Sequence, residues 1–144
     1  MLAIGFGLTL AIAACGSDST PVDPTSPDTP IGSYSIMTVN GKTLPAALID
    51  VQTPAPYKVE VMSGALNLAA DGKYTVVTRT RETISDNTSL YTDSTFGTWT
   101  RSGTQISLKN GEDHNAVSIG TWAGLQLTFV LVDTSVATTF VYKK

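Results

Sequence analysis

From Ser33 to the end of the chain, hydrophobic and polar residues alternate in short runs that are rich in valine, isoleucine, threonine and aromatic residues. Alternation with a period of two is typical of β-strands that have one face in a core and the other in solvent. Glycine and Asx residues separate the runs, as expected for tight turns. The pattern predicts about nine strands, at 34–39, 58–62, 65–69, 73–84, 91–101, 105–109, 116–122, 125–132 and 137–142.

Five dipeptides in this part of the chain are expected to form turns between strands. Asn40-Gly41 and Asp71-Gly72 are the strongest signals, because Asn, Asp and Gly tolerate the positive φ that tight hairpins require. The other three dipeptides are Ser63-Gly64, Ser102-Gly103 and Ala123-Gly124.

Short strands that follow one another through tight turns predict an all-β domain with an antiparallel up-and-down meander. A meander of about eight or nine strands leaves two unpaired edges unless it closes on itself, so we expect a barrel. Helical periodicity is weak along the chain. The one helical candidate is 44–51, where Pro45 would occupy the first turn.

The N-terminal region differs in character from the rest of the chain. Residues 2–14 are apolar and uncharged, and this run is shorter than the roughly 18–20 residues that cross a bilayer as a helix. Its length fits the hydrophobic region of a secretion signal. It ends in Ile12-Ala13-Ala14-Cys15, which resembles the bacterial lipobox. The resemblance implies cleavage before Cys15 and attachment of acyl chains such as palmitate to this cysteine, which would anchor the protein to a membrane.

The segment that follows the cysteine has the composition of a solvated linker. Ser, Thr, Asp and Pro dominate it, and prolines favour extended conformations. The alternative interpretation of 2–14, a buried helix that ends at an ordinary thiol, fits poorly with such a segment. We therefore expect a lipoprotein signal peptide at 1–14, the lipidated cysteine and a disordered linker at 15–32, and a barrel domain at 33–144. Gly16 favours the outer membrane of the cell envelope if the host is Gram-negative.

Charge and cysteine content narrow the classes of function. The formal net charge is −3, and Asp18, Asp23 and Asp28 all lie in the linker, so the remaining acidic and basic residues balance. No run of Lys or Arg occurs, and we expect no nucleic-acid partner. Cys15 is the only cysteine, so the core depends on burial and hydrogen bonding without an intrachain disulfide.

Three segments of the domain occur in a characteristic order, namely SYSIMTVNGKTLP, then VEVMSGALNLAADGKYTV, then FGTWTRSGTQISL. This order resembles the lipocalin-like domains of small bacterial lipoproteins. The resemblance implies a lipocalin-like barrel across 33–144, with a small apolar ligand or an envelope component as its partner. Lipocalins carry a Gly-x-Trp motif near the first strand, whereas here the motif lies late, at 97–99 and 120–122, so the ligand positions of that family are not transferred.

Residues that catalyse reactions or bind metals are scarce. His114 is the only histidine, so a zinc site with three or four nitrogen or sulfur ligands cannot be assembled. Glu112 and Asp113 in the same polar loop could bind Ca²⁺, but the carboxylate spacing of an EF-hand is absent, and a solvated loop is the simpler interpretation. The chain has no nucleophile elbow, phosphate-binding loop or dinucleotide motif. We expect no enzymatic activity, no metal and no cofactor.

Aromatic and arginine residues supply a candidate ligand pocket. Trp99, Trp122 and Phe129 occupy strand positions from which they would either line a cavity or fill the core. Arg79 and Arg81 share one face of a strand, where they would either solubilise its end or receive an anionic head group at the barrel mouth.

Two functional hypotheses follow from these features. The first is a membrane-anchored, non-catalytic module that binds a small apolar ligand or an envelope component. The second is a structural or protein-interaction lipoprotein whose barrel is filled and holds no ligand. A barrel of about eight strands can be either packed or hollow, so the state of its interior distinguishes the two.

Overall fold

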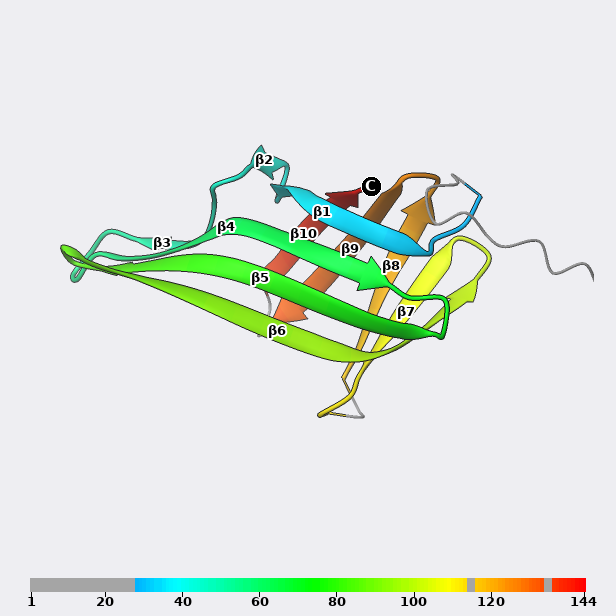
Figure 1. The fold of residues 1–144 in the computed structure, drawn as a ribbon. Helices are drawn as coiled ribbons and strands as arrows, with labels where there is room; N and C mark the ends of the chain where they lie inside the picture. The colour runs from blue at the N-terminus through cyan, green and yellow to red at the C-terminus, as the bar shows by residue number, and fades with distance from the viewer. Residues whose placement is uncertain (1–27, 114–115, 134–135) are drawn as a thin grey trace, which may run out of the picture.

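The computed structural model describes residues 28–113, 116–133 and 136–144, and these residues form β-strands and no helix (Figure 1). None of their elements is a helix with the length and apolarity to span a membrane. The ten strands of this part of the chain are β1 (Gly32–Val39), β2 (Lys42–Thr43), β3 (Ala46–Val51), β4 (Tyr57–Leu68), β5 (Lys73–Ile84), β6 (Asn87–Ser102), β7 (Gln105–Asn110), β8 (Val117–Ala123), β9 (Gln126–Asp133) and β10 (Val136–Lys143).

Eight of these strands close into an antiparallel barrel. Strands β4 to β9 each pair with the next strand in sequence, β10 pairs with β1, and β1 pairs with β4 to complete the ring. The two remaining strands lie outside the ring, β2 against β1 and β3 against β4. The prediction of an all-β meander that closes into a barrel is confirmed, and the architecture is compatible with a lipocalin-like barrel.

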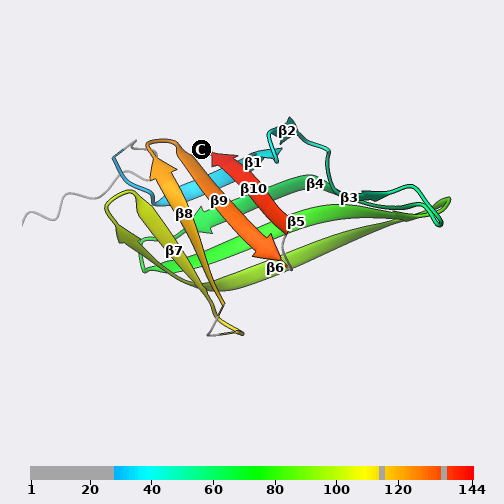
Figure 2. The same ribbon diagram turned by 180° about the vertical axis from the view of Figure 1, so that it is seen from behind.

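One end of the barrel continues into a flat sheet (Figures 1 and 2). Here 57–61 of β4 pairs with β3 and β5 but not with β1, and 87–95 of β6 pairs with β5 but not with β7. We call β3, 57–63, 78–84 and 87–94 together the extension. Within the described part of the chain, no strand pairs with the outer edge of β6 in the extension.

Large side chains fill the barrel end opposite the extension. Leu68, Ile106 and Leu127 are fully buried there, and each contributes about 1.5–3 kcal/mol of hydrophobic stabilisation. The ring of Tyr34 is also buried, and its hydroxyl donates a hydrogen bond of 2.7 Å to the carbonyl oxygen of Pro30. We call this the closed end of the barrel.

Most of the predicted turns are present. Asn40 and Gly41 have φ values of 52° and 76°, as a tight hairpin requires, and they join β1 to β2. The turns at Gly72, Gly103 and Gly124 also place glycine at positive φ, which explains the residue type at each position.

Two local predictions were wrong. Ser63-Gly64 is not a turn, because β4 runs unbroken past it with a bulge between Val61 and Ser63. Glycine is needed at position 64 for a different reason, since a Cβ atom there would overlap the side chain of Ile36 on the neighbouring strand β1. The helical candidate at 44–51 is also wrong. A helix that short is marginal on its own, and the segment instead forms β3, which pairs along β4.

Candidate ligand-binding site

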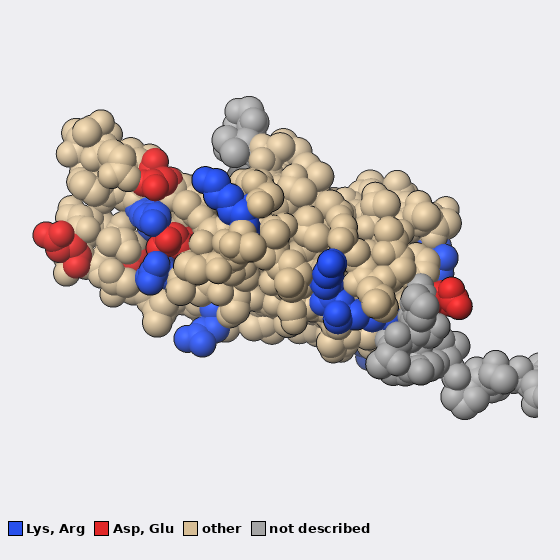
Figure 3. Space-filling view, turned by 90° about the horizontal axis from the view of Figure 1, so that it is seen from above, with Lys and Arg blue, Asp and Glu red and all other residues tan. Residues whose placement is uncertain are grey.

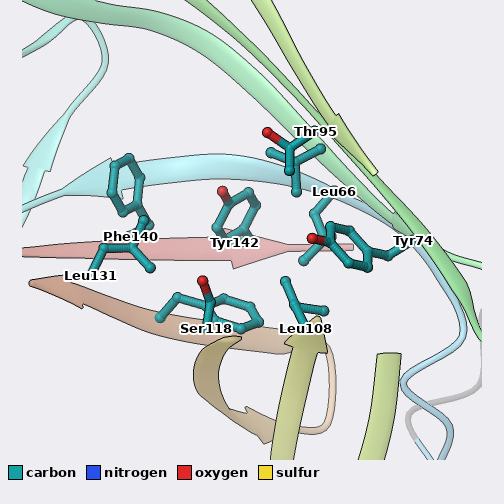
Figure 4. Close-up of a pocket in the computed structure, with 10 residues that line it drawn as sticks. Leu66, Tyr74, Thr95, Leu108, Ser118, Leu131, Phe140 and Tyr142 are labelled. Atoms are coloured by element: carbon teal, nitrogen blue, oxygen red, sulfur yellow. The ribbon is translucent and has the colours of Figure 1, made fainter. Parts of the chain in front are cut away.

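The barrel contains a half-enclosed cavity of about 140 Å³ near the end that carries the extension (Figure 4). An apolar cavity of about 150 Å³ is known to hold benzene, so this volume suits one small ring or a short chain. The residues that line it come from seven strands: Leu66, Tyr74, Val76, Thr95, Leu108, Ser118, Phe129, Leu131, Phe140 and Tyr142.

The space exists because the inward-facing residues of two strands become smaller toward this end. On β6 the inward row reads Trp99, Gly97 and Thr95 from the closed end outward. On β8 the corresponding row reads Trp122, Gly120 and Ser118. Large indole rings therefore occupy the closed end, while hydrogen, methyl and hydroxyl groups occupy the other end and leave it unfilled.

As far as residues 28–113, 116–133 and 136–144 show, the cavity wall combines apolar surface with four hydroxyl groups and no charged side chain. The hydroxyls belong to Tyr74, Thr95, Ser118 and Tyr142, which all line the cavity (Figure 4). Among the described residues, none of these four side chains has a hydrogen-bond partner. Burial raises the pKa of Tyr142 to about 12 and also raises the pKa of Tyr74, so both phenols stay neutral. The site can therefore offer hydrogen bonds to an uncharged molecule.

Of the three aromatic residues predicted to form the pocket, the structure places one, Phe129, in the cavity wall. Trp122 is buried toward the closed end, and the guanidinium carbon of Arg101 lies 4.2 Å from the centroid of its ring. Trp99 packs against the core, and its Nε1 donates a 2.9 Å hydrogen bond to the carbonyl oxygen of Ala69. Neither tryptophan reaches the cavity.

The two predicted arginines lie on the outer face of the extension and do not line the cavity. Arg81 donates hydrogen bonds of 2.9 and 2.7 Å from Nε and Nη2 to Oε2 of Glu60. Nζ of Lys58 lies 2.8 Å from Oε1 of the same carboxylate. Hydrogen bonds from Lys58 and Arg81 lower the pKa of Glu60, although burial opposes this effect. Arg79 borders a separate shallow hollow beside Ser63. Figure 3 shows basic and acidic side chains side by side at this end of the molecule.

The hydroxyl-bearing residues of the cavity were not predicted from the sequence. Serine and threonine in a strand are common at the surface, so their type alone gave no signal, and Thr95 and Ser118 were overlooked. The available signal was their position two residues before the glycine of each Gly-x-Trp motif, which assigns them to the inward face.

Two other residues singled out in the sequence, Cys15 and His114, lie outside the described residues. Within the described part of the chain, no group of three or more His, Cys, Asp or Glu side chains is arranged to hold a metal ion. A wider hollow of about 650 Å³ lies at the closed end, outside the barrel, and includes Leu68, Leu125 and Lys144. It lies on the surface near the point where the described chain begins, so the interior cavity is the better candidate site.

These features define a class of protein: a small antiparallel β-barrel, packed at one end and hollow at the other, with an apolar, hydroxyl-bearing cavity. Comparisons with protein-family models, with curated proteins and with solved structures found no match.

Proposed function

We propose that this protein is a lipoprotein of the cell envelope, anchored through Cys15, whose barrel binds a small, neutral, largely apolar molecule. The half-enclosed cavity of about 140 Å³ is the observation that carries the ligand-binding part of this proposal. Ligand sites in proteins are typically concave and apolar, with a few polar groups that orient the ligand. The lipobox and the Pro-rich linker support the anchoring part.

Binding without chemical conversion fits the cavity better than catalysis does. Its polar groups are hydroxyls, and the raised pKa values of Tyr74 and Tyr142 make these phenols poor general bases at neutral pH. In the described part of the chain, no carboxylate, imidazole or amine lines the cavity to activate them. The proposed role is therefore to hold a molecule and release it unchanged.

Two related probes test the binding site, toluene and p-cresol, which differ by one hydroxyl. The full-length protein in lipid nanodiscs is titrated with each probe by calorimetry, and empty nanodiscs provide the blank. We expect both probes to bind. The variant Tyr142→Phe should weaken p-cresol binding about three- to tenfold, the value of one hydrogen bond, and leave toluene unchanged.

The matched control is Tyr91→Phe, which removes the hydroxyl of an exposed tyrosine in the extension and should change neither affinity. A third variant, Ser118→Phe, places a ring in the cavity and should abolish binding of both probes. The proposed function is wrong if the wild-type protein binds neither probe, or if Ser118→Phe binds both as well as the wild type does.

The anchor is tested in cells by replacing Cys15 with alanine. We expect the variant to lose incorporation of a labelled fatty acid, to remain as an unprocessed precursor, and to change its distribution between membrane and soluble fractions. An unchanged lipid label and unchanged processing would rule out lipidation of Cys15.

The alternative function is a protein-interaction module, and the extension favours it. Ile49, Val51, Ile84 and Tyr91 are 42–51% exposed and share the face of the extension that continues from the cavity wall. The unpaired edge at 87–95 has no Lys or Pro to protect it.

A photo-crosslinking amino acid at Ile84 would then give one discrete protein adduct in cells. Thr83, on the opposite face, is the control position, and no adduct at Ile84 would exclude this function.

A further inference from the structure

The wall of the barrel is incomplete between β8 and β9. These strands pair in four positions, from Ala123 with Gln126 to Gly120 with Phe129, and the ladder then ends. Beyond this point 117–119 of β8 still pairs with β7, and 130–132 of β9 still pairs with β10. Figures 1 and 2 both show the two strands diverging toward the end that carries the extension. Two strand edges therefore face each other there without pairing.

A slot of about 370 Å³ lies between these two edges. Six residues line it: Val117, Ser118 and Ile119 from β8, and Val130, Leu131 and Val132 from β9. Ser118 and Leu131 also line the interior cavity, so the slot and the cavity are adjacent and share part of their walls. The slot thus opens on the side of the barrel next to the cavity.

The outer rim of the slot is unusually apolar for an exposed surface. Its four outward-facing residues, Val117, Ile119, Val130 and Val132, are between 50% and 71% exposed. A cluster of exposed aliphatic side chains around an opening is a common sign of a binding surface. Among the described residues, no charged side chain lines either the slot or the cavity.

We propose that the slot is a second subsite of the cavity and that the ligand is a linear, uncharged molecule with one polar end. This inference rests on the proposed ligand-binding function. The polar end lies among the hydroxyls of the cavity, and an aliphatic chain leaves through the slot and covers its valine and isoleucine side chains. Straight-chain alcohols and alkyl ketones have this chemistry, whereas a fatty-acid anion would bring a charge that neither subsite can pair.

The other way out of the cavity is less suitable for an aliphatic chain. It leads along the face of the extension that continues from Val76 and Thr95. Asp93 and Glu82 occupy that face, because the strand register places them in line with these two residues. A chain in that direction would lie against carboxylates, whereas a chain in the slot lies against aliphatic side chains and the uncharged backbone groups of the two strand edges.

A series of straight-chain alcohols from 1-butanol to 1-decanol tests the slot. The full-length protein in lipid nanodiscs is titrated with each alcohol, and partition into lipid cancels when variants are compared at the same lipid content. The cavity alone holds a chain of a few carbons. We expect affinity to keep rising beyond that length, by about two- to fourfold for each added methylene that the slot covers.

The variants Ile119→Gln and Val130→Gln should flatten this rise from 1-hexanol onward and leave p-cresol binding unchanged. The control Leu90→Gln replaces a similarly exposed aliphatic residue on the outer face of β6, away from the slot, and should leave the series as in the wild type. In addition, 1-octanol with a diazirine at the end of its chain should label 117–119 and 130–132 upon irradiation.

The outcomes separate the slot from the proposed function. If p-cresol binds but the affinity of the alcohols stops rising at 1-butanol, or if the diazirine labels the extension, the slot is not a subsite and the cavity still is. If the glutamine variants behave as Leu90→Gln does, the slot is likewise excluded. If neither p-cresol nor any alcohol binds, both proposals are wrong.

Discussion

Gly120 on β8 packs directly against the ring of Phe129 on β9, and we expect alanine at this position to destabilise the barrel and reduce the cavity. A Cβ atom on residue 120 would lie 2.6 Å from Cδ1 and Cε1 of Phe129 and 2.8 Å from the backbone oxygen of Thr128. These distances are well inside van der Waals contact, so the ring must move. Because Phe129 also lines the cavity, its displacement changes the space that a ligand would occupy.

The expected size of the effect follows from two opposing terms. Forcing an extra methyl group into a packed interior costs about 1–3 kcal/mol. The backbone of Gly120 is not in the left-handed region, so alanine also restricts the unfolded chain and recovers about 0.4–1 kcal/mol. The net loss in the free energy of unfolding should be about 1–2 kcal/mol, and each kcal/mol lowers Tm by about 4–8 °C in a domain of this size.

Urea unfolding of a double-mutant cycle with Phe129→Leu measures this contact. Removing the ring should relieve the side-chain part of the clash, although the contact with the backbone oxygen of Thr128 remains, so the double variant should be about 1 kcal/mol more stable than the sum of the single effects predicts. Gly97→Ala serves as a contrast, because a Cβ atom there would overlap the backbone oxygen of Lys109, which no side-chain truncation removes. The reasoning would be refuted if Gly120→Ala had the same free energy of unfolding as the wild type. It would also be refuted if the effects of Gly120→Ala and Phe129→Leu on this free energy were strictly additive.

Three further substitutions address the electrostatics and the strand closure. Glu60→Gln should lower stability by about 1 kcal/mol at pH 7, since its cationic partners are more than a third exposed and solvent screens them. Because the pKa of Glu60 is lower in the folded protein, its ionised carboxylate stabilises the fold at pH values above the pKa of Glu60 in the unfolded chain. This stabilisation disappears as pH falls through the lowered pKa. The free energy of unfolding between pH 3 and 7 should therefore depend less on pH in Glu60→Gln than in the wild type. Burial raises the pKa of Tyr142 from 10.0 to about 12, so its contribution to stability falls as pH rises from 10 to 12, by at most about 2.7 kcal/mol. Tyr142→Phe should reduce the loss of stability between pH 9 and 11 by this share, while the share of Tyr34, whose pKa is also raised to about 12, remains. Asn40→Ala should cost about 1–2 kcal/mol in urea unfolding, because it strains a residue at φ 52° and removes the acceptor of the 2.8 Å hydrogen bond from the Thr139 amide; equal stability would mean that this bond contributes nothing.

The fold was predictable from the sequence where local chemistry determines it. Asn40-Gly41 and Asp71-Gly72 form the turns that their φ preferences indicate, and the predicted bounds of β5 agree with the structure. The prediction failed at Gly64, because the reason for glycine there is a contact with Ile36 on a strand that is distant in sequence. A Ser-Gly pair where two strands approach closely has the same composition as a Ser-Gly pair in a turn. The residue types alone therefore do not distinguish the two.

The extension and the slot were not predictable, because both arise from differences in length between paired strands. β5 and β6 have 12 and 16 residues, whereas β7 has 6, so the long strands continue past the barrel as a flat sheet. The slot forms because β8 and β9 stop pairing after four positions while each keeps its other neighbour. Hydrophobic alternation assigns residues to faces, but it does not reveal where a ladder between two strands ends.

The location of the cavity, in contrast, was encoded in a repeat that the sequence displays. The residue two positions before each Gly-x-Trp motif, Thr95 or Ser118, shares the inward face with the glycine and the tryptophan. A small, small, large order on two strands that flank β7 must leave space at the small end, whichever strand they pair with. It must also fill the end that holds the two indole rings. The tryptophans that suggested a ligand pocket are therefore the reason that the pocket lies at the other end of the barrel, where the same two rows end in hydroxyl groups.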